Sequence, residues 1–172
     1  MDAPVYDIRL ATMEDVDKIR QSIRYTLTNP EGRPQRKRYE DAVQRGELLV
    51  LTHYDPRERT THIDGFIEWH TKVDGSITIR DAGSAGDEVN PGIIKRLLRE
   101  LLRLTNPPRA TVKVNADQPV WNSIFAETPG FILEGQEYSR PHWRNIWVYA
   151  PELVPPRERE QRPAGRARPR RR

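Results

Sequence analysis

Apolar and polar residues alternate in several short stretches of the first half of the chain, and this period of two predicts β-strands. The strands expected here cover residues 5–10, 47–54, 63–73 and 77–82. The third alternates most clearly, with Ile63, Ile67, Trp69 and Val73 expected on one face and Asp64, Glu68 and Lys72 on the other. Asp74 and Gly75 then form a strong turn pair, which predicts a hairpin to the next strand. The last three of these strands should form an antiparallel meander.

Apolar residues recur at helical spacing in other stretches. Thr12, followed by Asp15 three residues later, is a variant of the capping box and predicts a helix start. The apolar stripe of this helix consists of Val16, Ile19, Ile23 and Leu27. The very basic residues 34–45 carry a narrow apolar stripe and predict a short surface helix.

The longest helix is expected in the second half of the chain. Asn90 suits an N-cap and Pro91 the first helical position. Six Ile and Leu residues between positions 93 and 102 form a broad apolar stripe, and Asn106-Pro107-Pro108 stops the helix. Pro119 opens a second, shorter helix.

Three more strands are expected at residues 110–114, 131–138 and 145–150, so the element order is βααβββαβαββ. Helical crossovers between strands require parallel pairing, whereas the meander is antiparallel. We therefore expect an α/β (α+β) fold with a mixed, mostly antiparallel central sheet flanked by helices. Residues 1–154 should form one domain, and the Pro- and Arg-rich residues 155–172 a disordered basic tail.

The charge of the chain is concentrated in this tail. The 172 residues carry a net charge of +4, but residues 155–172 hold eight Arg and two Glu, or +6, which leaves −2 for the rest. The basic balance therefore belongs to a tail rather than to the domain, and this tail is either a solubilising disordered end or a segment that binds phosphates. The chain has no Cys, which excludes disulfides, thiolate nucleophiles and Cys-type zinc sites.

Other classes of protein are excluded by missing patterns. No stretch approaches the ~18 apolar residues that span a bilayer, and the first ten residues lack the features of a signal peptide, so we expect a cytoplasmic protein. The four histidines have no metal-ligand spacing, and no metal site is expected. Without a Gly-x-Ser-x-Gly elbow or a P-loop, hydrolase and NTPase functions have no supporting motif.

The element order and two local phrases resemble the GCN5-related N-acetyltransferase family over about residues 5–150. The stretch from Ile8 to Ile19 is similar to the family's first strand and helix. VNADQPVWNSIFAETPGF, residues 114–131, is similar to its strand, short helix and Gly-Phe block near the C-terminal end. The resemblance implies transfer of an acetyl group from acetyl-CoA directly to a primary amine of a small molecule or a protein.

The resemblance also implies where acetyl-CoA binds. In the family, the pantetheine arm pairs with the backbone of the fourth strand. The pyrophosphate lies on N–H groups at the start of the following helix, where free donors and the positive end of the helix dipole meet. The cofactor-binding positions carried over to this chain are Ala82, Asn90, Gly92, Ile93 and Gln118.

The loop before this helix departs from the family's Gln/Arg-x-x-Gly-x-Gly/Ala signature. Of residues 89–94, only Gly92 matches. Pro91 removes one N–H donor, and Asp87 and Glu88 bring negative charge toward a pyrophosphate. Three cations on the same helix compensate: Lys95, Arg96 and Arg99.

Amine acetylation needs a base, and a carboxylate can supply it. The candidates are Glu68 on the third strand and Asp81 near the end of the fourth, with Tyr138 as an acid. The family's usual acid, a Tyr, falls on Ala126 or Phe125 here, and neither has a proton to give. Each candidate also suits a structural role on a polar strand face, at a strand end or in packing.

The altered loop leaves a second hypothesis open. A catalytically inactive binding module of the same fold could bind a protein or nucleic-acid partner, with its Arg-rich tail and the Arg36–Arg38 run on phosphates. His70 shares a strand face with Glu68 and is a further polar candidate. Trp143 is expected in the loop before the last strand, and this loop often lines the acceptor site in the family that the chain resembles. The resemblance thus implies that Trp143 lines an acceptor site, and a place in the core is the alternative.

Overall fold

The computed structural model describes residues 5–34 and 37–156. Its elements follow the predicted order βααβββαβαββ. They are β1 (Tyr6–Leu10), α1 (Met13–Ser22), α2 (Tyr39–Arg45), β2 (Leu48–Asp55), β3 (Thr60–Thr71), β4 (Ile77–Ser84), α3 (Pro91–Thr105), β5 (Ala110–Asn115), α4 (Pro119–Ala126), β6 (Phe131–Ser139), β7 (His142–Tyr149) and a short 3-10 turn, η1 (Pro151–Leu153).

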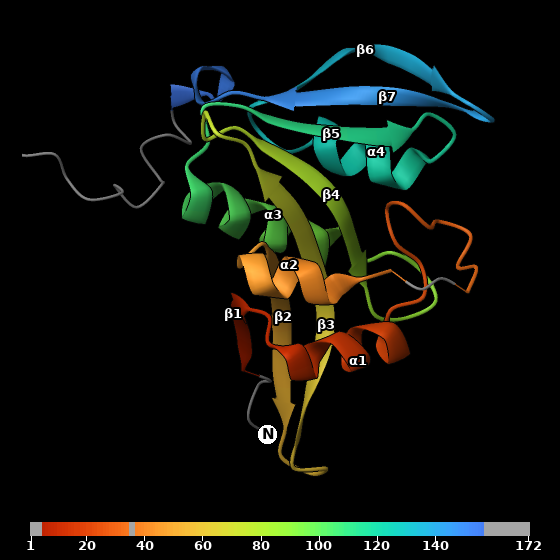
Figure 1. Cartoon of the computed structure of the whole chain (residues 1–172), viewed down its shortest axis with the longest axis vertical. Helices are drawn as coiled ribbons and strands as arrows, with labels where there is room; N and C mark the ends of the chain where they lie inside the picture. The colour runs from red at the N-terminus through yellow and green to blue at the C-terminus, as the bar shows by residue number, and fades with distance from the viewer. Residues whose placement is uncertain (1–4, 35–36, 157–172) are drawn as a thin grey trace, which may run out of the picture.

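All seven strands form one sheet, in the order β1-β2-β3-β4-β5-β7-β6. Every neighbouring pair is antiparallel except β4 and β5, which are parallel. Helices α1 and α2 cover one face of the sheet, and α3 and α4 lie against the other (Figure 1). The expected mixed, mostly antiparallel sheet flanked by helices is therefore confirmed.

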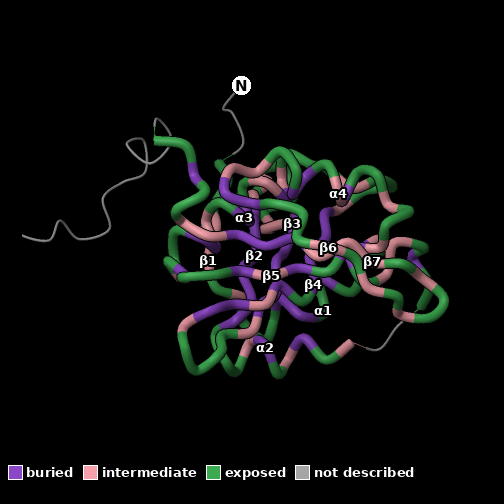
Figure 2. The backbone as a smooth tube through the Cα atoms, turned by 90° about the horizontal axis from the view of Figure 1, so that it is seen from above, coloured by how far each residue is buried: buried purple, intermediate pink, exposed green. Residues whose placement is uncertain are grey.

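Each face of the sheet has its own hydrophobic core. The core under α3 and α4 is the larger and includes Leu97, Leu98 and Leu101, which are fully buried. The core under α1 and α2 includes Ile19 and Phe66. Figure 2 shows the buried backbone concentrated in the centre of the sheet, while β6 and β7 are largely exposed or half-buried.

Helix α3 forms as its sequence predicts. The side chain of Asn90 accepts a hydrogen bond from the Ile93 N–H, and Pro91 occupies the first helical position. The helix ends at Asn106, whose φ of 41° is left-handed. Helix α1 likewise begins with the predicted capping box between Thr12 and Asp15.

Helix α1 ends earlier than its apolar stripe predicts. The helix stops at Ser22, yet Leu27 remains buried at 4% exposure. Leu27 instead lies in a segment that pairs with β4, where its N–H donates to the Ala82 carbonyl at 2.9 Å and Thr26 forms a bridge with Gly83. The helical spacing of Leu27 was therefore misleading, because a strand-like contact buries this residue.

A β-bulge changes the predicted faces of β3. Thr52 pairs with Ile63 and Leu51 with Gly65, so Asp64 is left without a partner in the register. The bulge turns Ile63 toward the α1–α2 core, whereas Ile67 faces the α3 core. The single apolar face expected for residues 63–73 is therefore wrong, and Val73 lies beyond the strand and is fully exposed.

Two further predictions concern the ends of elements. Strand β7 begins at His142, so Trp143 lies in a strand and not in the loop expected before it. The basic stretch 34–45 contains a helix only from Tyr39 onward. Arg36 and residues 157–172 of the expected basic tail lie outside the described residues. Within the described ranges, no helix is long and apolar enough to cross a membrane.

Candidate functional site

Strands β4 and β5 pair only at their first residues. Ile77 pairs with Ala110 and Thr78 with Thr111, and in the described chain no further residue of β5 pairs with β4. Figure 1 shows β4 running away from β5 after this point. The stretch of β4 beyond Thr78, which includes Asp81, therefore has an edge that β5 does not cover.

A second bulge determines where Asp81 points. Trp69 pairs with Ile79 and Glu68 with Asp81, so Arg80 is skipped in the register. Directly opposed residues of antiparallel strands share a face. The bulge therefore brings the carboxylates of Glu68 and Asp81 together on the α1–α2 face, although they lie 13 positions apart in the sequence.

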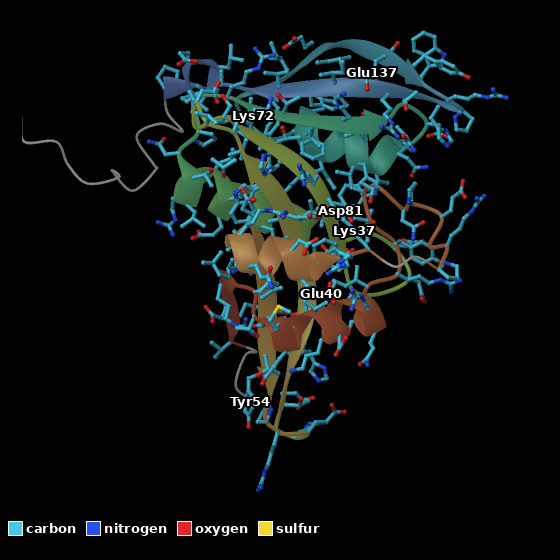
Figure 3. The ribbon with its side chains drawn as sticks, viewed as in Figure 1. Lys37, Glu40, Tyr54, Lys72, Asp81 and Glu137 are labelled. Carbon is cyan, nitrogen blue, oxygen red and sulfur yellow. The ribbon has the colours of Figure 1, made fainter. Side chains whose placement is uncertain are left out.

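Lys37 bridges these two carboxylates. Its Nζ lies 2.7 Å from Glu68 Oε1 and 2.9 Å from Asp81 Oδ2. The side chains of Glu68 and Asp81 are 5% and 0% exposed, and that of Lys37 is 25% exposed. Figure 3 shows Lys37 and Asp81 side by side. Glu68 Oε1 accepts no hydrogen bond of good geometry from the part of the chain that the structure describes, so its contact with Lys37 is an ion pair without a directed hydrogen bond.

Asp81 makes three further contacts. Its Oδ1 accepts hydrogen bonds from the backbone N–H groups of Thr28 at 3.1 Å and Ala82 at 3.0 Å. Its Oδ2 lies 3.4 Å from the hydroxyl of Tyr39, which donates to it. Burial, followed by the negative charges of Asp81 and Glu68, raises the pKa of Tyr39, so this hydroxyl keeps its proton. We refer to Lys37, Tyr39, Glu68 and Asp81 as the carboxylate cluster.

The cluster corrects one hypothesis about the basic residues. Lys37 was expected to contribute to a phosphate-binding run with Arg36 and Arg38, but its ammonium turns inward onto two carboxylates. A cation held in this way is not available to a phosphate. His70 lies outside the cluster, because its Nδ1 faces Glu47 Oε1 at 3.5 Å.

Tyr138 lies elsewhere in the sheet. It belongs to the edge strand β6, and β7 separates that strand from β5. Its side chain is exposed and its ring contacts that of Trp143, with the centroids 5.4 Å apart. The structure therefore brings two of the three predicted catalytic residues together, Glu68 and Asp81, but not the third. Phe125 is buried against Phe131.

The start of α3 offers fewer free backbone N–H donors than the start of a helix usually does. Pro91 has no N–H, the N–H of Ile93 donates to the Asn90 side chain at 3.3 Å, and that of Asn90 donates to Ser84 Oγ at 2.8 Å. The N–H of Gly92 makes no hydrogen bond to the described residues. A Cβ at Gly92 would meet only Asn90 Oδ1, at 3.3 Å, so space remains above this donor.

The predicted cofactor positions on β4 and α4 differ in which of their polar groups are free to bind a ligand. The carbonyl of Ala82 accepts from Leu27, and its N–H donates to Asp81. The unpaired edge of β4 that remains therefore covers Ile79 to Asp81. Gln118 is the N-cap of α4 without a side-chain cap, and its carbonyl accepts from Asn122 Nδ2.

These features fit the parts of a coenzyme A thioester. The edge at residues 79–81 suits a pantetheine arm, and the Gly92 N–H suits a phosphate oxygen. Of the cations on α3, Lys95 pairs with Glu127, Arg96 lies over the Tyr6 ring, and Arg99 is exposed. The start of α3 thus offers a pyrophosphate fewer donors than the family signature provides.

Sequence reasoning missed Lys37, Tyr39 and Thr28 as members of the site. Lys37 lies in a run of basic residues and Tyr39 on an apolar stripe, and both patterns are typical of ordinary surface and core positions. The only available signal was the pair of carboxylates on consecutive strands. Two such groups need a cation if they are buried.

The structure also brings three ligand-type side chains together at the β2–β3 hairpin. Atoms of Asp55, Glu58 and His62 lie within 4.8 Å of one another, and His62 Nε2 is 3.2 Å from Glu58. Spacing in the sequence did not predict this group. All three are partly or fully exposed, and such groups are common in proteins without a metal ion.

No protein-family model matches the sequence, and no curated protein matches it. Solved structures do match. A GNAT-family acetyltransferase from Bacillus cereus ATCC 10987 has a TM-score of 0.63 at 14% identity, over 85% of this chain and 97% of that one. An acetyltransferase from Bacillus anthracis str. Ames, solved in complex with acetyl coenzyme A, has a TM-score of 0.64 at 13% identity, over 85% and 98%.

The ribosomal-protein-S18-alanine N-acetyltransferase from Escherichia coli is also similar, with a TM-score of 0.60 at 13% identity, over 88% of this chain and 96% of that one. Identities this low establish the architecture and not the activity. The seven-stranded sheet, its single parallel contact between β4 and β5 and the order of its helices agree with these matches. The chain therefore has the fold of the GCN5-related N-acetyltransferases.

Proposed function

We propose that the protein is an acetyl-CoA-dependent N-acetyltransferase whose acceptor is a primary amine of a small molecule or a protein. The observation that carries the proposal is the position of Asp81. It stands on the stretch of β4 whose edge toward β5 is unpaired, and Glu68 pairs with it from β3 on the other side. Two groups that can take a proton are thus beside the strand edge that fits a coenzyme A thioester.

The cofactor would be held by backbone and by cations. The edge from Ile79 to Asp81 would pair with the pantetheine arm, and the Gly92 N–H with Arg96 and Arg99 would meet the pyrophosphate. Bound acetyl-CoA supplies an acetyl group activated as a thioester. Because the chain has no Cys, the acetyl group would pass to the amine without a thiol relay on the protein.

The residues of the chain handle the proton of the amine. An amine is mostly ammonium at neutral pH, and it must lose a proton before its nitrogen can attack. Glu68 and Asp81 already lie within hydrogen-bond reach of an ammonium, that of Lys37. Ala126 and Phe125 have no proton for the leaving thiolate, and Tyr138 lies on the edge strand β6, so water would provide the proton.

Thermal unfolding with and without millimolar acetyl-CoA tests the proposal. A ligand at ~100 times its Kd stabilises the folded state by about 2.7 kcal/mol. For a chain of this size that corresponds to a rise in Tm of roughly 5–11 °C. An unchanged Tm, together with no heat of binding in calorimetry, would contradict the enzyme and leave the inactive binding module as the better reading.

A variant of Gly92 locates the binding site. Gly92→Glu puts a carboxylate in the first turn of α3, where it suits the helix dipole but repels a pyrophosphate. We expect the variant to fold with an unchanged or higher Tm and to lose at least tenfold in affinity for acetyl-CoA in calorimetry. Leu104→Glu, which adds the same charge at an exposed position near the other end of α3, is the matched control and should bind like the wild type.

A further inference from the structure

The carboxylates of Glu68 and Asp81 already bind an ammonium. Two carboxylates on neighbouring strands repel each other, and burial makes the repulsion stronger because little water screens it. A single ammonium, that of Lys37, contacts both at 2.7 and 2.9 Å. The contact with Asp81 is a hydrogen bond donated by the ammonium, whereas the contact with Glu68 is ionic. The two carboxylates therefore favour one compact cation that carries an N–H donor, and a primary ammonium has this form.

The path to these carboxylates is also defined. The four-carbon stem of Lys37 carries the ammonium past the ring of Tyr39, with Nζ 5.5 Å from the ring centroid. Only 25% of this side chain is exposed, so the stem is largely enclosed. An unbranched alkyl chain is thus the shape that the surrounding residues accept.

Lys37 is attached to a connecting segment and not to a helix or strand. It lies between α1 and α2, two positions before Tyr39, and its carbonyl accepts a hydrogen bond from Arg20 Nη2 at 2.9 Å. Withdrawal of its side chain breaks no backbone hydrogen bond of an element. The ammonium of Lys37 can therefore leave the carboxylates while the sheet below stays intact.

We propose that Glu68 and Asp81 are a receptor for the ammonium of an unbranched primary alkylamine, and that Lys37 occupies this receptor until the acceptor amine displaces it. The acceptor would be a lysine side chain or an aliphatic amine of similar form. The assignment of this amine as acetyl acceptor rests on the proposed function, whereas the receptor does not. In the reaction, the ammonium gives one proton to a carboxylate, the amine nitrogen bonds to the acetyl carbon, and the carbon–sulfur bond breaks. Coenzyme A leaves as a thiolate and takes the second proton of the nitrogen through water.

Replacement of Lys37 and addition of a free amine test the receptor. Lys37→Ala removes three carbons and the ammonium, which together correspond to n-propylammonium. We expect Lys37→Ala to lower the Tm, because two buried carboxylates lose their cation. n-Propylammonium chloride should restore it in a saturable way, by roughly 3–6 °C at ten times its Kd. Tetramethylammonium chloride at equal concentration has no N–H donor and should not.

Two variants serve as controls. Lys113→Ala removes a lysine that pairs with Glu137 at 3.0 Å on the surface, and n-propylammonium should leave its Tm unchanged. Lys37→Met keeps an unbranched side chain and removes the charge. This side chain still fills the space that the stem of Lys37 occupies, so n-propylammonium should not restore the Tm. If Lys37→Ala does not fold alone, its refolding yield with each of the two salts gives the same comparison. Equal effects of the two salts, or none, would overturn the receptor.

A second readout separates the receptor from the proposed function. The recovery of Tm by n-propylammonium needs no cofactor, so it tests the receptor independently of the proposed function. With n-propylamine as the acceptor, Lys37→Ala should release coenzyme A thiol from acetyl-CoA. Its KM for n-propylamine should be at least tenfold below that of the wild type, where Lys37 competes for the receptor. Rescue and acetyl-CoA binding without thiol release would refute the amine as acceptor. Rescue without any acetyl-CoA binding would refute the proposed function instead.

Discussion

The side chain of Asn122 of α4 makes four hydrogen bonds, and three of them join the helix to the second half of the sheet. Its Nδ2 donates to the carbonyls of Asn115 at 3.0 Å and Gln118 at 2.8 Å. Its Oδ1 accepts from Asn145 Nδ2 and Trp147 Nε1, both at 2.9 Å. Asn122→Ala removes all four bonds, and therefore the polar link from α4 to β5 and β7, while the helical backbone stays intact.

The loss of unfolding free energy depends on how many of the four former partners of Asn122 can bond to water instead. A hydrogen bond contributes a net ~1 kcal/mol, and a buried group left without a partner costs more. The indole N–H of Trp147, a residue 8% exposed, is the most enclosed of the four partners. The expected loss is about 2–4 kcal/mol of unfolding free energy, or roughly 4–16 °C in Tm for a chain of this size.

Urea unfolding followed by tryptophan fluorescence measures this loss, and an unchanged m-value shows that the folded state keeps its compactness. Asn122→Asp keeps both acceptor contacts but turns a carboxylate oxygen toward the carbonyls of Asn115 and Gln118, so its loss should be at least as large. Gln136→Ala removes only an exposed amide that donates to Asn145 at 2.7 Å, and should change stability by less than about 0.5 kcal/mol. A loss below about 1 kcal/mol for Asn122→Ala would refute the reasoning.

Two other predictions concern pH and a turn. Burial by itself raises the pKa of Asp15, but hydrogen bonds from Arg9 and the backbone hold it below its ordinary value of 3.8. The stabilisation is therefore complete above that value and is lost as the pH falls through the folded pKa, so Asp15→Asn should flatten the dependence of Tm on pH in this acidic range. Gly130 has a φ of +92°, and a Cβ there would lie 2.6 Å from the ring of Tyr149. Gly130→Ala should cost about 2–4 kcal/mol in urea unfolding, whereas Gly135→Ala, with nothing within 4 Å of the added Cβ, should cost less than about 1 kcal/mol.

Local signals predicted most of the fold. The capping box at Thr12, the Asn90–Pro91 helix start and the turn at Gly75 depend on residues a few positions apart, and all three are confirmed. The order of the elements followed from them. The register of β3 could not be predicted, because its bulge at Asp64 depends on which residues of β2 it meets.

The same reason limits what the sequence reveals about the site. Glu68 and Asp81 were individual candidates, but their pairing depends on the skipped position at Arg80. The inward turn of Lys37 depends in turn on that pairing, because a lysine among basic residues is otherwise expected in solvent. The catalytic roles of Glu68, Asp81 and Tyr138 remain predictions, as do the cofactor positions Ala82, Asn90, Gly92, Ile93 and Gln118.

The short contact between β4 and β5 divides the backbone of the sheet. Within residues 5–34 and 37–156, only two residue pairs join the four strands β1–β4 to the three strands β5–β7. Across this seam, the two parts are held mainly by side chains of the core under α3, such as Leu97 and Leu98. An extended ligand bound along residues 79–81 would supply amide hydrogen bonds that the protein lacks there. The backbone amides of β4 would then exchange their hydrogens mainly when the ligand has left. Ligand occupancy and the local protection of β4 from hydrogen exchange would therefore report the same binding equilibrium.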